Sequence, residues 1–188
     1  PIYIVLAVGY LKESIMTWCD GRYPNLSIYF AIENSPLGTG GAIANALHHC
    51  SNDEVLLLNG DTYFELNYQE FFNFHQNHGS ICSLALKPMQ DFDRYGCVVT
   101  DAQHHITSFL EKSYRENGLI NAGVYLLDRK YFMSQPWPEV FSFEKDFLEK
   151  KVENNQLSGF VANGYFIDIG IPSDYEKAQT DFKLLFPS

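Results

Sequence analysis

Short apolar runs alternate along the chain with segments whose apolar residues recur at helical spacing. Apolar runs bounded by polar residues or glycine are typical of buried strands, so the alternation predicts crossover units around a sheet covered on both faces. The expected strands are residues 2–8, 27–32, 55–58, 80–86, 121–127 and 157–162. A hairpin-like pair is expected within 95–112, with its turn near Asp101.

The segments between these strands carry the helical pattern. The expected helices are residues 12–20, 42–50, 68–78, 141–154 and a closing helix from residue 173. Gly79 is expected to end the third helix and Ser142 to cap the fourth, because a serine oxygen accepts hydrogen bonds from the first free amides of a helix. No repeat or linker divides the pattern, so we predict one α/β domain over residues 1–188.

Composition and charge narrow the class of protein. The 188 residues are 46% hydrophobic, which is enough for one core, and the net charge of -10 argues against a broad basic face for nucleic acid. Cys19, Cys50, Cys82 and Cys97 lie far apart without a CxxC pair, as expected for reduced thiols in a cytoplasmic protein. No apolar stretch reaches the roughly 20 residues of a membrane span, so we predict no membrane partner.

Two carboxylates follow apolar runs directly. Asp61 ends "LLLNGD", and Asp168 lies within "YFIDIG". Ligands of open α/β sheets bind beyond the carboxyl ends of strands, and two carboxylates that met there would suit Mg²⁺. In the alternative interpretation each aspartate serves the fold alone: Asp61 accepts hydrogen bonds from the amides of the next turn, and Asp168 pairs with a lysine.

A glycine-rich segment, "PLGTGGA", lies between a predicted strand and a predicted helix and is expected to be a loop. Ile43 stands where a dinucleotide fingerprint requires its third glycine, and no Gly-Lys-Ser/Thr follows, so a P-loop is excluded as well. The glycines indicate that something approaches this backbone closely, unless they serve only a tight turn.

The six histidines show no convincing metal spacing. His75 and His78 are one helical turn apart, which we interpret as a solvated helix face. The segment "SFEKDF" is interpreted as the opening of a helix.

Taken in order, the motifs "PLGTGGA", "LLLNGD", "RYGCV", "FLEK", "NAGVYLL" and "FIDIGIPSDY" resemble those of sugar-nucleotide pyrophosphorylases, the sugar-1-phosphate nucleotidyltransferase family. The resemblance extends from end to end and is closest to the bacterial guanylyltransferases for mannose 1-phosphate and D-glycero-D-manno-heptose 1-phosphate. It implies a three-layer α/β/α, glycosyltransferase-A-like fold with a mostly parallel mixed sheet. It also implies that a nucleoside triphosphate, GTP first, reacts with a sugar 1-phosphate and releases pyrophosphate.

The resemblance also implies roles for individual residues. Mg²⁺ would be held by Asp61 and Asp168, and Lys112 would bind the sugar phosphate as the third catalytic residue. The implied nucleotide-binding residues are Pro36, Leu37, Gly38, Thr39, Gly41 and Gly60. The implied sugar-phosphate-binding residues are Tyr95, Gly96, Glu111, Lys112, Asn121 and Gly123.

The chain departs from the family at its start. The family's first strand and glycine-rich triphosphate loop have no counterpart before "PIYIVLAVGY", and we expect that the recorded chain is N-terminally incomplete. The rival hypotheses are another base and sugar pair, such as thymidylyl, cytidylyl or uridylyl transfer, and a non-catalytic regulatory homologue that binds nucleotide sugars. A dinucleotide oxidoreductase is disfavoured by the broken fingerprint. Homo-oligomer formation stays open.

Overall fold

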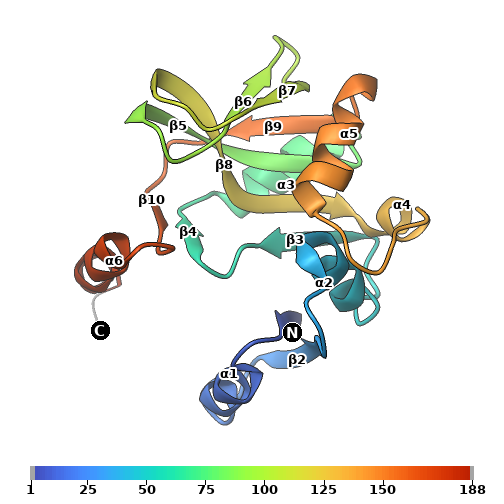
Figure 1. Ribbon diagram of the computed structural model, residues 1–188, viewed down its shortest axis with the longest axis vertical. Helices are drawn as coiled ribbons and strands as arrows, with labels where there is room; N and C mark the ends of the chain where they lie inside the picture. Colours follow the sequence, from blue (N-terminus) through green and yellow to red (C-terminus); the bar gives the residue numbers. More distant parts are fainter. Residues whose placement is uncertain (1–2, 187–188) are drawn as a thin grey trace. The chain divides into compact units, whose positions relative to one another are not determined.

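The computed structural model describes residues 3–186 and contains two compact units. Within the described residues, the first unit consists of residues 3–55 and 128–151, and the second of residues 56–127 and 152–186. Figure 1 shows the elements of both units. Ile2, the predicted start of the first strand, lies outside the described residues.

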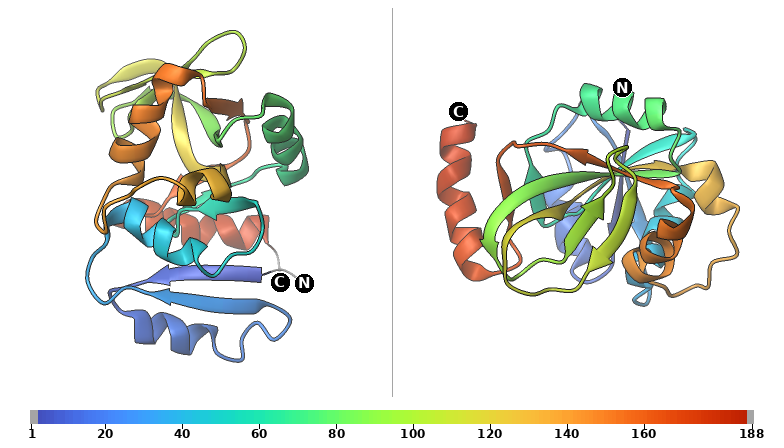
Figure 2. Two further views of the ribbon diagram at one scale, coloured as in Figure 1. Left: turned by 90° about the vertical axis from the view of Figure 1, so that its right-hand side faces the viewer. Right: turned by 90° about the horizontal axis from the view of Figure 1, so that it is seen from above.

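The first unit contains a parallel pair of strands and a group of helices. In chain order its elements are β1 (Tyr3–Val8), α1 (Lys12–Cys19), β2 (Ser27–Ile32), α2 (Gly38–Leu47), α4 (Arg129–Met133), the π-helix η1 (Phe143–Leu148) and α5 (Glu149–Lys151). β1 and β2 pair in register from Tyr3 with Ser27 to Val8 with Ile32, and α1 connects them (Figure 2). This is the crossover unit that the sequence pattern predicts.

An aromatic cluster fills the core of the first unit. Trp137 stacks on Phe141 with ring centroids 4.9 Å apart, and its indole N–H donates to the carbonyl of Phe132 at 2.7 Å. Phe143 and Phe147 pack against Phe132 and are fully buried. The segment that joins α4 to η1 is therefore held by large buried rings.

The second unit is built on a mixed sheet. Strand order along its main path is β7-β6-β8-β5-β9, and β3 pairs with β8 off this path. The bounds are β3 (Glu54–Leu58), β5 (Cys82–Phe92), β6 (Cys97–Thr100), β7 (Ile106–Leu110), β8 (Arg115–Asp128) and β9 (Leu157–Val161). β5 and β9 are parallel, whereas β5–β8, β6–β8 and β6–β7 are antiparallel. Three of the four pairings on the main path are antiparallel where the sequence predicts mostly parallel pairing, and two of them are made by the long strand β8 with β5 and β6.

The remaining elements of the second unit are β4 (Thr62–Phe64), α3 (Tyr68–His78), the 3₁₀ turn η2 (Val152–Asn154), β10 (Phe166–Asp168) and α6 (Pro172–Leu185). α3 has the predicted bounds and ends at Gly79, whose φ of 60° is left-handed. Its face toward the sheet packs Phe71 into a cluster with Phe64, Ala85, Val124 and Leu126.

His75 corrects one expectation from the sequence. α3 presents it to β5 rather than to solvent: the side chain is 3% exposed, and Nδ1 lies 2.7 Å from Ser83 Oγ. A solvated helix face is therefore wrong for His75. Within residues 3–186 no three His, Cys, Asp or Glu side chains come close enough to hold a metal ion together.

Two other features concern the cysteines and the helices. All four cysteines are free, with Cys82 and Cys97 buried and Cys19 and Cys50 partly exposed. Among the helices of the described chain, none combines the length and the apolar character needed to cross a membrane.

Candidate functional site

The strand ends that carry Asp61 and Asp168 meet in the second unit. β10 pairs with β4 in antiparallel register, with Asp168 opposite Thr62. The amide of Ile169 donates to the backbone carbonyl of Asp61 at 2.9 Å. Asp61 directly precedes β4 and Asp168 ends β10, so two aspartates more than a hundred residues apart in sequence lie at the same end of one strand pair.

The surroundings of the two carboxylates fit a divalent cation. Asp168 is half-buried and its Oδ1 accepts a hydrogen bond from the Gly170 amide at 2.8 Å, while Asp61 is exposed. Across residues 3–186, no lysine or arginine forms a salt bridge with either of them. Mg²⁺ commonly takes one or two carboxylates and completes its shell with water and phosphate oxygens, which matches this donor set. The alternative that Asp168 pairs with a lysine is wrong.

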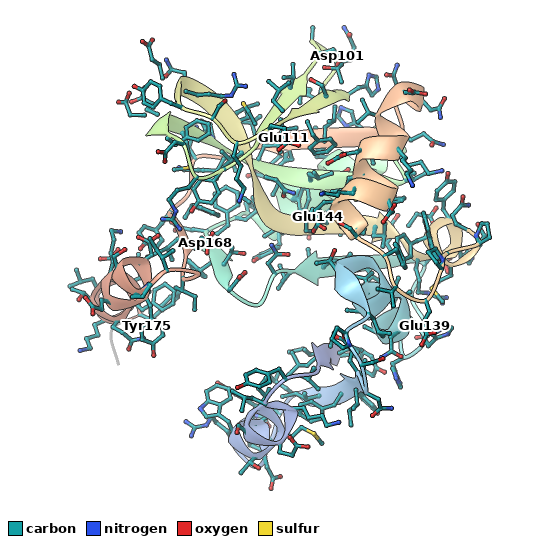
Figure 3. All side chains as sticks on the ribbon, in the orientation of Figure 1. Asp101, Glu111, Glu139, Glu144, Asp168 and Tyr175 are labelled. Carbon is teal, nitrogen blue, oxygen red and sulfur yellow. The ribbon has the colours of Figure 1, made fainter. Side chains whose placement is uncertain are left out.

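Tyr95 and Arg94 lie next to this pair. Burial, and after it the negative charge of Asp168, raises the pKa of Tyr95, and its ring packs edge-on against Phe166 of β10. The Arg94 guanidinium donates to Asp174 Oδ2 at 2.5 Å, a bond that raises the pKa of Arg94. The motifs "RYG" and "DIGIPSDY" are therefore in direct contact (Figure 3 labels Asp168 and Tyr175). The sequence motifs alone do not indicate a role for Arg94 or Asp174.

The "NAG" motif lies against the "NGD" motif. The carbonyl of Gly123 accepts a hydrogen bond from the Asn59 amide at 2.8 Å. Gly123 has a φ of 72°, and a Cβ there would lie 2.7 Å from Asn59 Nδ2 and 2.8 Å from Thr62 Oγ1. Asn121 Oδ1 accepts from the Gly123 amide at 3.1 Å. Glycine at 123 is thus required by the turn that carries Gly60 and Asp61.

Glu111, labelled in Figure 3, and Lys112 follow β7, and both are exposed. Neither side chain has a hydrogen bond or an ion pair within the described part of the chain, so the alternative of a strand-end ion pair between them is not observed. Gly96 lies beside them, because a Cβ at Gly96 would be 2.9 Å from the carbonyl oxygen of Leu110. Lys112 is therefore a cation that has no carboxylate partner among residues 3–186.

The predicted nucleotide-binding segment, residues 36–41, belongs to the first unit. α2 begins at Gly38, so the expected loop is shorter than predicted. The Gly40 amide donates to the Phe141 carbonyl at 3.0 Å, and the Phe141 amide donates to the Leu37 carbonyl at 3.1 Å. A Cβ at Gly41 would lie 2.5 Å from the carbonyl oxygen of Glu139. What approaches the glycines on this side is the protein's own segment 139–141.

The side chain of Glu144 completes this contact. Thr39 Oγ1 donates to Glu144 Oε2 at 2.7 Å and accepts from the Phe143 amide at 2.9 Å. Ser142 caps η1, as predicted, by accepting from the Lys145 amide at 3.2 Å. Sequence reasoning read "SFEKDF" only as a helix start and therefore missed Glu144; no spacing rule links it to a threonine more than a hundred residues earlier.

Comparison with known proteins gives a consistent set of relatives. The profile described as "Nucleotidyl transferase" matches residues 5–183. The D-glycero-alpha-D-manno-heptose 1-phosphate guanylyltransferase of Aneurinibacillus thermoaerophilus is 43% identical over 96% of this chain and 78% of that protein. The enzyme of the same name from Campylobacter jejuni is 42% identical over 92% and 75%. The mannose-1-phosphate guanylyltransferase of Mycobacterium tuberculosis is 30% identical over 95% of this chain and 51% of its own length.

Solved structures agree with the fold. The crystal structure of HddC from Yersinia pseudotuberculosis superposes with a TM-score of 0.86 at 38% identity and covers 96% of this chain and 79% of that one. A second crystal structure of the same protein, complexed with GMP-PN, superposes with a TM-score of 0.84. These comparisons confirm the expected fold class.

Proposed function

Since the chain belongs to the nucleotidyl transferase family, we propose that it transfers GMP from GTP to D-glycero-D-manno-heptose 1-phosphate and releases pyrophosphate. The observation that carries this proposal is the 43% identity, over 96% of the chain, to a guanylyltransferase named for that substrate. The GMP-PN complex of a relative 38% identical supports a guanine nucleotide as donor.

Each of the motifs has its own role in the proposed reaction. Residues 36–39 and Gly60 bind the nucleotide, and Gly41, buried against segment 139–141, supports the backbone of residues 36–39. Asp61 and Asp168 would hold Mg²⁺, which would offset the negative charge of the phosphates. Their positions, Asp61 directly before β4 and Asp168 at the end of the paired β10, support this role, and neither forms a salt bridge within residues 3–186.

On the sugar side, Lys112 binds the 1-phosphate and fixes the nucleophile. The sugar pocket is lined by Tyr95, Gly96, Glu111, Asn121 and Gly123. A phosphate oxygen of the sugar 1-phosphate attacks the α-phosphorus of GTP, the bond from that phosphorus to the bridging oxygen breaks, and pyrophosphate leaves with the electron pair. No side chain is needed as a nucleophile, because positioning and electrostatics provide most of the rate enhancement in such transfers.

Mannose 1-phosphate is the second candidate acceptor, since a mannose-1-phosphate guanylyltransferase is 30% identical over 95% of the chain. The four free cysteines suit a reducing compartment, and we propose that the protein acts in the cytoplasm.

The test is to incubate the full-length protein with Mg²⁺, each of the four nucleoside triphosphates and a panel of hexose and heptose 1-phosphates, and to measure pyrophosphate. We expect the fastest release from GTP with the heptose compound. Faster release with another base or sugar would reassign the substrates. Binding of a nucleotide sugar without any pyrophosphate release would instead support the regulatory homologue.

A further inference from the structure

Glu144 holds two hydroxyl groups in fixed orientations. A carboxylate is only an acceptor, so both Thr39 Oγ1, at 2.7 Å, and Ser142 Oγ, at 2.9 Å, must give it their single proton. Each hydroxyl is then left with only lone pairs for its second contact. Thr39 uses one to accept from the Phe143 amide, and Ser142 uses one to accept from the Lys145 amide. One carboxylate oxygen thus receives the protons of both hydroxyl groups, and each hydroxyl is held from its other side by a backbone amide.

The position of Glu144 is set by an irregular turn of helix. The amide of Glu149 donates to the carbonyl of Glu144, which is the i to i+5 bond of a π turn. Such turns are rare in proteins and are frequent at functional sites. The turn lies on the buried cluster of Phe143 and Phe147, so its backbone is rigidly supported.

The side chain of Glu144 is not what joins the two segments. Backbone bonds between Gly40 and Phe141, and between Phe141 and Leu37, already tie residues 37–40 to residue 141. Gly40 and Gly41 are buried against segment 139–141, whereas Pro36, Gly38 and Thr39 are exposed. The inner side of the segment is therefore fixed by the backbone, and Glu144 acts on its outer, accessible side.

We propose that Glu144 is a positioning residue for the nucleotide. By fixing the Thr39 hydroxyl, it holds the exposed side of residues 36–39 in the one conformation that receives the base. This inference rests on the proposed function of residues 36–39. It gives Glu144, about a hundred positions after Thr39, a part in nucleotide selection.

The test uses the full-length protein with Glu144→Ala, Glu144→Gln, Thr39→Val and the double variant Glu144→Ala/Thr39→Val. Glu149→Ala, an exposed position in the same helical segment, is the matched control. We expect Glu144→Ala to raise the KM for GTP about five- to tenfold, as for the loss of a hydrogen bond, while the KM for the sugar 1-phosphate stays within about twofold. Glu144→Gln keeps an acceptor oxygen and should restore most of the affinity.

Two further measurements separate orientation from stability. The double variant should be no worse than the worse single variant, because both changes break the same bond. Hydrogen exchange of the amides of residues 38–43 should be faster in Glu144→Ala, with a melting temperature close to that of the control. An unchanged KM for GTP, an equal rise in both KM values, or unchanged exchange would overturn the inference.

Failure of the proposed function would look different. If the unsubstituted protein binds GTP in calorimetry but releases no pyrophosphate, the proposed reaction is wrong, and the GTP dissociation constants of the variants decide the role of Glu144. If it binds no nucleotide, both proposals fall.

Discussion

Two glycines of the predicted nucleotide-binding motifs have opposite surroundings: Gly41 in the first unit and Gly60 in the second. A Cβ at Gly41 would lie 2.5 Å from the carbonyl oxygen of Glu139, whereas a Cβ at Gly60 would have nothing within 4 Å. The fold itself therefore demands glycine at position 41. At position 60 the fold leaves room for a side chain, so glycine would be required there only by a bound ligand.

The same contrast extends to the regions around them. Residues 37–41 are bound to segment 139–144 by backbone and side-chain hydrogen bonds. Asp61 and Lys112 are exposed and have no ion pair with residues 3–186. Substitutions of the buried glycines in the first region should therefore lower stability, whereas those in the second region should change activity alone.

The largest expected effect is a loss of turnover in variants of the second region. Asp61→Asn or Asp168→Asn should lower kcat about a hundredfold or more, in the range seen when one group that stabilises developing charge is removed. Thermal unfolding should change little, because an Asn at 168 still accepts from the Gly170 amide. Asp20→Asn, at an exposed position, is the charge-matched control. Near-normal turnover in both variants would refute the cation assignment.

The next effect belongs to the first region. Gly41→Ala should lower the free energy of unfolding by about 1–3 kcal/mol, since the added methyl group meets a backbone carbonyl that cannot move aside alone. Urea denaturation of the variant and the parent measures it. An unchanged midpoint would mean that segment 139–141 yields easily and that the contrast between the two regions is weaker than the structure implies.

Gly60→Ala sharpens the contrast. Its free energy of unfolding should stay within about 0.5 kcal/mol of the parent, because the site has open space. The KM for GTP should rise several-fold, by the steric exclusion of a ligand that approaches the backbone. If steady-state kinetics show no change in that KM, Gly60 does not border the nucleotide.

The smallest effect concerns acid stability near η1. A hydrogen bond from Lys150, together with one from the Ser142 amide, lowers the pKa of Asp146 below 3.8, its ordinary value. A carboxyl group with a depressed folded-state pKa stabilises the fold above its unfolded pKa, and this contribution is lost as the pH falls through the folded value. In urea denaturation, Asp146→Asn should be slightly less stable than the parent at pH 7, and the gap should close toward pH 3. A gap independent of pH would exclude this linkage.

Much of this could be predicted from the sequence because the deciding signals are local. The bounds of α3 follow from its helical period and from Gly79 as its end, and the structure adds Asn67 as its N-cap. The meeting of Asp61 and Asp168 follows from a rule about strand ends. The two paired strands beside them, β4 directly after Asp61 and β10 ending at Asp168, have three residues each, too few for an alternating pattern to indicate.

The misses have a common cause in contacts between residues distant in sequence. Three glycines and a threonine do not predict the start of a helix, yet α2 begins at Gly38, where the Phe141 carbonyl accepts a hydrogen bond from the Gly40 amide. The polarity of His75 indicates solvent, but Ser83 of β5 provides a hydrogen-bond partner inside the core. Neither partner can be identified from the local pattern.

The π turn at Phe143–Leu148 is less regular than an α-helix, but it places Glu144 against Thr39. A π turn contains one residue more than the α-helical ladder, so a single deletion within it would let ordinary i to i+4 bonds form. The same deletion would rotate the preceding residues about the helix axis by about 100° and carry Glu144 away from Thr39. A design procedure that favours ideal helices would therefore delete the extra residue of the π turn. The helix would become regular, and Thr39 would lose its hydrogen bond to Glu144.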